Sequence, residues 1–265
     1  MKGGRKLSRL NVYVHYDSVT NHFMTRGVRL NTIDFLKPYM PQNIILADEQ
    51  EEFGRFDIHT NFKILKGQTM VADYFDICFK EKRRMSNWID FDSVEMMHQL
   101  TPIEISEILY LFHATKALRS PFFYKLQNNF VYLNMPNGLT KTYYRHMTQF
   151  YPRFQRSITG HMQEILNERV SWFNRRKIQV ERLPQKQVER LSPLFLNGIK
   201  FDFNQAYESQ DSWHIPLFVI EDELTQLTRD LPISKAVADL AYCHSKQSWT
   251  LELYLSNESE SLEEI

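Results

Sequence analysis

The side chains of this sequence best suited to chemistry are nine histidines and two cysteines. Metal sites need such ligands at short and regular spacing, as in the HExxH pattern. The histidines do not have this spacing, since they are scattered over the chain at His15, His22, His59, His98, His113, His146, His161, His214 and His244. We therefore predict no metal site from the sequence.

The two cysteines, Cys78 and Cys243, are far apart in the chain and neither has a neighbouring cysteine. This excludes a disulfide framework and a cysteine-based zinc cluster. His244 follows Cys243, but successive side chains of a strand point to opposite faces, so the adjacency does not indicate a nucleophile. We expect both cysteines to be ordinary buried thiols.

Two acidic residues, Asp90 and Asp92, alternate with apolar residues in the stretch WIDFD. On an extended segment their carboxylates lie on the same side, as acid–base or Mg²⁺ sites need. The alternative, which we favour, is that Asp92 caps a helix beginning at Ser93. An enzyme with a site assembled from dispersed His, Asp and Tyr residues therefore stays one of three hypotheses.

Glycine is scarce, with eight in 265 residues. Loops that cradle phosphate need glycines because backbone N–H groups must approach the anion closely. Neither GxxxxGK[ST] nor GxGxxG occurs, and the nucleophile pattern GxSxG is missing as well. We predict no bound cofactor.

Charge is distributed unevenly although Lys+Arg and Asp+Glu balance at 32 each. The segment 141–190 holds eleven basic and four acidic residues, whereas residues 201–265 hold three basic and thirteen acidic. A cationic surface of this kind can bind nucleic acid. The candidate nucleic-acid-binding residues are Arg153, Arg156, Arg175, Arg176 and Lys177. The alternative, which we favour, is a solvated helix face paired with the acidic C-terminal quarter.

The order of elements before this segment is similar to a winged helix-turn-helix. A helix at 101–116, a short helix at 120–129 and a hairpin at 129–145 would follow one another. The candidate second helix, PFFYKL, is mostly apolar, whereas a recognition helix presents polar and basic side chains to the bases. Nucleic-acid binding is therefore an alternative hypothesis and not the preferred one.

Apolar patterns predict the elements that would position these residues. Alternation predicts strands at 12–16, 43–47, 56–65 and 69–79, the last two forming a hairpin. Thr101 followed by Pro102 and Glu104 indicates a helix start. An Asn-Gly turn predicts a hairpin of strands 129–133 and 140–145, and a last hairpin is expected at 237–243 and 249–255.

Three- and four-residue apolar spacing predicts one long helix near 152–177. A shorter helix is expected around 185–195, with further strands at 199–203 and 213–220. The fold class is therefore α+β, with one or more mainly antiparallel sheets packed against a helical middle region.

Composition indicates a globular chain, with 43% hydrophobic residues. We predict one globular domain over residues 1–255 and a disordered acidic tail at 256–265. The N-terminus does not resemble a secretory signal and no window reaches the roughly 18 apolar residues of a membrane span, which predicts no membrane contact and a cytoplasmic location. We favour a non-enzymatic binding or regulatory protein that acts through a protein partner or as a homo-oligomer.

Overall fold

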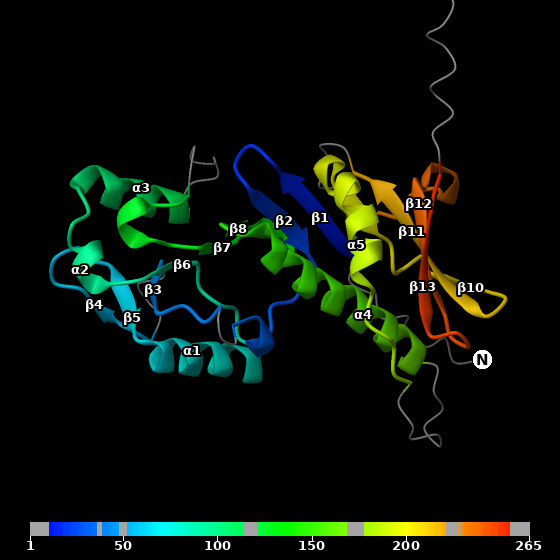
Figure 1. Ribbon diagram of the computed structural model, residues 1–265, viewed down its shortest axis with the longest axis horizontal. Coiled ribbons are helices and arrows are strands. Elements are labelled where there is room, and N and C mark those ends of the chain that lie inside the picture. Colours follow the sequence, from blue (N-terminus) through cyan, green and yellow to red (C-terminus); the bar gives the residue numbers. More distant parts are fainter. Residues whose placement is uncertain are drawn as a thin grey trace, which may run out of the picture. The chain divides into compact units, whose positions relative to one another are not determined.

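The fold is α+β, and neighbouring strands pair antiparallel throughout the described residues (Figure 1). The computed structural model describes residues 11–35, 39–47, 52–113, 121–168, 178–220, 227 and 229–254. The chain divides into two compact units, each built from separate stretches of sequence. Unit 1 comprises Met1–Tyr16, Arg26–Val28 and Phe154–Ile265, and unit 2 comprises Asp17–Thr25 and Arg29–Arg153.

The prediction of one domain over residues 1–255 stays a prediction, and the tail at 256–265 lies outside the described residues. No helix in the described part of the chain is both long and apolar enough to cross a membrane.

Unit 2 is a sheet with helices on both faces. Its strand order is β2-β8-β7-β6-β3-β5-β4. The strands are β2 (His22–Arg26), β3 (Asn43–Leu46), β4 (Arg55–Phe56), β5 (Lys63–Lys66), β6 (Trp88–Phe91), β7 (Phe130–Asn134) and β8 (Thr140–Tyr144). The α-helices are α1 (Gln68–Lys80), α2 (Val94–Met97) and α3 (Pro102–His113). The 3-10 turns are η1 (Thr32–Phe35), η2 (Tyr124–Leu126), η3 (Pro136–Gly138) and η4 (Met147–Gln149).

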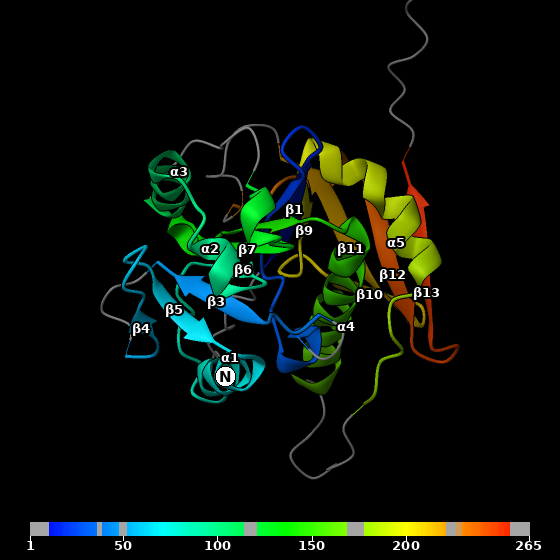
Figure 2. The same cartoon turned by 60° about the vertical axis from the view of Figure 1, so that its left-hand side comes forward.

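Strand alternation gives the two faces of this sheet different cores. Ile45, Ile89 and Val131 share one face and pack with Ile108 and Leu111 of α3. The next residues along each strand face α1, which lies on the other side of the sheet (Figure 2). That second core is aromatic, with Phe35, Phe75, Trp88 and Phe130 in mutual ring contact. Asp90, one residue after Ile89 on β6, therefore shares the aromatic face.

Unit 1 is a sheet of order β13-β12-β11-β9-β1, with β10 paired to β11. Its strands are β1 (Val12–Asp17), β9 (Ile199–Phe201), β10 (Tyr207–Ser209), β11 (Ser212–Val219), β12 (Ala238–Cys243) and β13 (Ser248–Leu253). Its other elements are α5 (Gln185–Leu191), η5 (Ser192–Asn197), η7 (Ile233–Lys235) and α4 (Phe150–Glu168), which begins in unit 2. The ring of Phe154 from α4 contacts those of Phe195 and Phe201, so α4 covers one face of this sheet.

Several predicted elements are confirmed. The hairpins β7–β8 and β12–β13 form as expected. The long helix is present as α4, beginning at Phe150, and its predicted part at 169–177 lies outside the described residues. Pro152 falls in the first turn of α4, where its missing N–H has no intrahelical partner to lose. Thr101 and Glu104 cap α3 reciprocally, since each side chain accepts the other residue's backbone N–H.

Other predictions are wrong. Residues 69–79 form helix α1 and not a strand, because Val71, Tyr74, Phe75 and Cys78 bury one helical face at spacings of three and four. The strand predicted at 56–65 is interrupted by a turn in which Asp57 accepts backbone N–H bonds from His59 and Thr60. The helix predicted at 120–129 is reduced, within the described residues, to the 3-10 turn Tyr124–Leu126. The winged helix-turn-helix order is therefore not formed.

Candidate functional site

A pocket of about 460 Å³ opens on the aromatic face of unit 2. Its volume lies within the range of small-molecule sites, roughly 300–1,000 Å³. Separate stretches of the chain build its wall, among them η1, the strand β6, the start of β7, η4 and the first turn of α4. The lining residues are Phe35, Tyr39, Met40, Pro41, Gln42, Gln68, Trp88, Asp90, Phe91, Asp92, Gln127, Asn129, Phe130, His146, Gln149 and Arg153.

Asp90 is the buried acid of this pocket, with a relative exposure of 8%. Its Oδ1 accepts backbone N–H bonds from Asn129 at 2.9 Å and Phe130 at 2.7 Å, and its Oδ2 lies 3.1 Å from the Asn129 nitrogen. The carboxyl thereby caps the first N–H groups of β7. Burial nevertheless raises its pKa to about 7, more than these hydrogen bonds and the charge of Arg145 lower it. Asp90 can therefore exchange a proton at neutral pH.

Arg153 is the buried basic residue of the same pocket. Its side chain is 4% exposed, its Nε lies 3.4 Å from Oδ1 of Asp34, and its Nη1 donates to the Tyr144 hydroxyl at 2.7 Å. Its guanidinium carbon lies 5.2 Å from the ring centre of Phe35 and 4.7 Å from that of Phe130. Aromatic faces and one carboxylate thus hold the guanidinium in a fixed position.

The entrance of the pocket is polar. His146, Gln42, Gln127 and Asn129 are exposed residues that line it, and Gln149 is half-buried. Gln127 adopts a left-handed backbone conformation with φ of 49°, which is uncommon for a residue other than glycine. Amide and imidazole groups around a buried acid and a buried arginine can orient a polar ligand by hydrogen bonds.

The two acidic residues singled out in the sequence, Asp90 and Asp92, both line this pocket. Asp90 on β6 is buried, whereas Asp92, one residue after the end of β6, is exposed. The favoured role of Asp92 as a helix cap is wrong, because the hydroxyl of Ser93 accepts the N–H of Met96 and so caps α2. Ser93, one position after Asp92, is the N-cap of α2 instead.

The five candidate nucleic-acid-binding residues fall in three places. Arg153 lies in the pocket of unit 2. Arg156 lies on α4 in unit 1, half-buried, and burial followed by the nearby charge of Arg182 lowers its pKa. Arg175, Arg176 and Lys177 lie outside the described residues. Their role in nucleic-acid binding stays a prediction.

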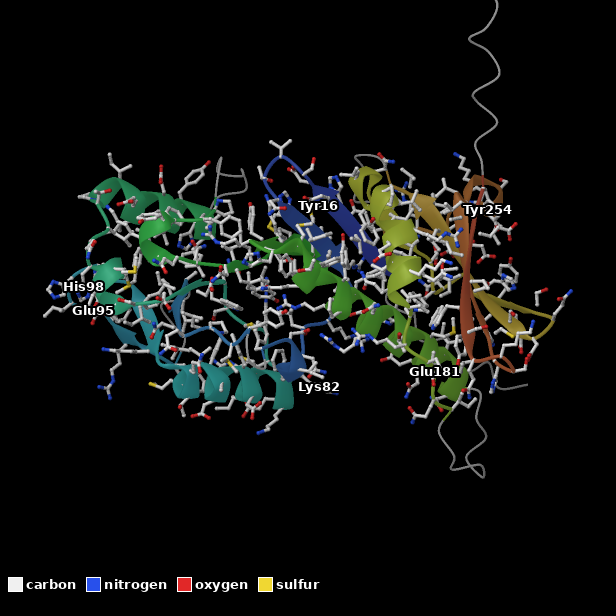
Figure 3. All side chains as sticks on the ribbon, viewed as in Figure 1. Tyr16, Lys82, Glu95, His98, Glu181 and Tyr254 are labelled. Carbon is white, nitrogen blue, oxygen red and sulfur yellow. The ribbon has the colours of Figure 1, made fainter. Side chains whose placement is uncertain are left out.

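The thiols and the histidines are also placed. Cys78 is buried as expected, whereas Cys243 is half-buried and contacts Ser245, so its prediction as a buried thiol is wrong. His98, labelled in Figure 3 near Glu95, lies 2.8 Å from Asp57. No group of three or more His, Cys, Asp and Glu residues in the described part of the chain could hold a metal ion.

The sequence identified Asp90 but not the environment of Arg153. Arg153 lies five residues before Ile158, a spacing outside the three- and four-residue steps of the apolar stripe of α4, so its burial could not be read from the sequence. Comparisons of the chain with protein-family models, with curated proteins and with solved structures found no match.

Proposed function

We propose that this protein binds a small polar molecule in the pocket of unit 2. The observation that carries the proposal is the burial of two ionisable groups of opposite sign, Asp90 and Arg153, in the wall of one pocket of small-molecule size. Burying an ionisable group costs free energy unless it is paired or hydrogen-bonded, and groups with shifted pKa values are commonly found at ligand sites. The proposal keeps the class of a non-enzymatic binding protein, but with a small molecule in place of the protein partner or second copy expected from the sequence.

The lining residues define the chemistry of this ligand. Asp90 can accept a hydrogen bond as carboxylate and donate one when protonated, so it suits a hydroxyl, amide or heterocyclic N–H group. Tyr39, an exposed aromatic residue of the lining, offers apolar surface to a ring or alkyl part, while the amides of Gln127 and Gln149 offer both donors and acceptors. We therefore expect a compact molecule with a flat or apolar part and several polar groups.

A screen of fragments by NMR tests this proposal on the full chain. The indole N–H signal of Trp88 reports on the pocket, because this side chain lines it and is held by a hydrogen bond to the sulfur of Met85. Polar fragments that bind should shift this signal. Asp90→Asn should weaken their binding by about tenfold, the effect of losing a hydrogen bond to a charged group. Asp76→Asn, an exposed aspartate on α1 outside the pocket, is the matched control.

Two results would contradict the proposal. One is a set of bound fragments that leaves the Trp88 signal unchanged. The other is an equal affinity loss in Asp90→Asn and Asp76→Asn, which would mean that net charge and not the pocket governs binding.

A second candidate function is general acid–base catalysis in the same pocket. The pKa of about 7 at Asp90 favours it, since a catalytic acid or base works best near the operating pH. The imidazole of His146 at the entrance offers a second side chain that can donate or accept a proton. NMR of a bound compound over hours separates the two functions: chemical turnover that Asp90→Asn abolishes identifies an enzyme, whereas an unchanged compound identifies a binding protein.

A further inference from the structure

The outward face of the sheet in unit 1 carries two acidic residues directly opposite each other. In the strand register Pro216 of β11 faces Asp239 of β12, which in turn faces Glu252 of β13. Paired residues of neighbouring strands point to the same face, with Cβ atoms roughly 4.5–5.5 Å apart, and like charges in this position are destabilising. The core residues Leu240 and Leu251 lie one position along and point to the other face, towards the interior.

Asp239 is buried on this face with a relative exposure of 5%, and only one of its oxygens has partners. Oδ2 accepts the hydroxyl of Tyr207 at 3.2 Å and lies 2.8 Å from Nδ1 of His214. The rings of Tyr207 and His214 stack at 5.0 Å with an angle of 12° between their planes. Oδ1 is buried and has no hydrogen-bond partner among the described residues. A buried acceptor without a donor is rare and costs free energy.

Two exposed tyrosines flank these carboxylates. Tyr207 is 40% exposed and Tyr254, which follows β13 and is labelled in Figure 3, is 44% exposed. The pKa of Tyr254 is raised to about 12, first by burial and then by charge interactions with Asp239, Tyr207 and Glu252, so this ring lies close to the two carboxylates. His214 forms an ion pair with Asp239 when its imidazole is protonated, whereas no described residue forms an ion pair with Glu252.

We propose that Asp239, Glu252, Tyr207 and Tyr254 form a binding site for an organic cation that carries N–H donors, a guanidinium or a primary ammonium. The cation compensates the two facing carboxylates, one N–H group donates to Oδ1 of Asp239, and a tyrosine ring covers the charge. Because Oδ1 is covered in this conformation, binding requires the side chains around it to rearrange, and rotamer changes of exposed residues such as Tyr207 and Tyr254 are fast. The site lies within unit 1 and does not depend on the function proposed for unit 2.

Titration of the full chain with small cations tests this site. For this titration the protein is prepared with ¹³C-labelled tyrosine rings. The signals of Tyr207 and Tyr254 are assigned by their loss in Tyr207→Phe and Tyr254→Phe. Butylguanidinium and butylammonium should shift both signals with saturation in the millimolar range, up to about 10 mM, as expected for a single charge-assisted contact. Tetramethylammonium, a cation without an N–H group, should bind at least about fivefold more weakly.

Two variants with the same charge change separate the site from a general field. Glu252→Gln changes an exposed residue and should raise the dissociation constant of butylguanidinium about fivefold. Glu208→Gln, next to Tyr207 on β10 but on its other side, should leave the constant unchanged. N-acetyl-arginine amide, which carries its guanidinium on a peptide-like backbone, distinguishes an arginine side chain from a free guanidine as the ligand. Tighter binding than butylguanidinium indicates an arginine side chain of a peptide, equal binding indicates a free guanidine, and both support the site.

Three results would overturn the proposal. The tyrosine signals could fail to saturate with either donor cation. Glu252→Gln and Glu208→Gln could alter binding equally. Tetramethylammonium could bind as well as butylguanidinium, which would remove the role of Asp239 as hydrogen-bond acceptor.

Discussion

Replacing Asp90 by asparagine should change how the stability of the protein depends on pH. The amide side chain would keep an oxygen for the N–H groups of Asn129 and Phe130, so the hydrogen bonds that hold β7 to β6 can be retained. It cannot ionise. The substitution therefore isolates the free energy of charging one buried carboxyl.

The sign and size of this effect follow from the two pKa values. The pKa of Asp90 is raised from 3.8, the value for an unperturbed aspartate, to about 7, so the folded protein binds the proton more tightly than the unfolded chain. The resulting stabilisation is complete below the lower value and is lost as the pH rises through the higher one. From about pH 5 to about pH 8 the free energy of unfolding should therefore fall by about 2.5 kcal/mol through this group alone.

Urea unfolding at these two pH values measures the difference, with tryptophan fluorescence as the signal. Wild-type protein should lose about 2.5 kcal/mol more than Asp90→Asn on going to the higher pH. Asp92→Asn is the matched control, because Asp92 lines the same pocket but is exposed. An equal change in the free energy of unfolding of wild type and Asp90→Asn between the two pH values would refute the reasoning.

Three further predictions concern single side chains, each checked by urea unfolding. Thr101→Ala should cost about 1 kcal/mol because α3 loses its N-cap. Asp57→Asn should flatten the acid limb of the stability curve: burial opposes the shift, but the hydrogen bonds from His98 and the turn N–H groups lower the pKa of Asp57 to about 2, so its contribution is present above 3.8 and is lost as the pH falls towards 2. Gly198→Ala should cost more than about 1 kcal/mol, since its φ is 70° and a Cβ would lie 2.8 Å from the Tyr13 hydroxyl.

The parts of the fold that could be predicted from the sequence are those with a local cause. The hairpin β7–β8 follows from the turn sequence at Asn137-Gly138, and the start of α3 follows from the side chains of Thr101 and Glu104. In both cases the decisive contacts join residues a few positions apart. Local chemistry was therefore sufficient.

Helix α1 shows where local patterns mislead. Its stretch TMVADYFDICF is rich in residues that favour strands, although Asp73 and Asp76, three residues apart, would point to opposite faces of a strand. The same residues also place Val71, Tyr74 and Cys78 on one helical face. Which period prevails depends on the surface offered by the rest of the chain, here the aromatic face of the sheet. That surface forms only in the folded protein and cannot be inferred from a single sequence.

The candidate site was only partly predictable for a related reason. The WIDFD pattern singled out Asp90 and Asp92, which both line the pocket, but the burial that raises the pKa of Asp90 comes from the packing of β6 beside β7. The aromatic rings around Arg153 come from η1 and β7, far from it in sequence. Tertiary packing creates the unusual chemistry, and spacing along the chain does not encode it.

Burial of charge alone does not identify a functional site, as a buried ion pair in unit 1 illustrates. Lys200 and Asp202 of unit 1 are fully buried at 2.7 Å from each other, and neither is among the residues that line the pocket of unit 2. Asp202 also accepts backbone N–H bonds from Asn204 and Gln205, so this pair has its partners within the fold. It holds a turn in place.

Asp90 differs from that pair in a way that bears on function. Its partners within hydrogen-bond distance are backbone N–H groups, and no described cation forms an ion pair with it. Its side chain lines a pocket. An apolar residue would remove the cost of charging a buried carboxyl, yet the chain keeps an acid there beside the strained backbone of Gln127. Departures from local rules that gather at one pocket are typical of sites under functional constraint. The same reasoning predicts that Lys200→Met with Asp202→Leu alters stability but leaves ligand binding in unit 2 unchanged.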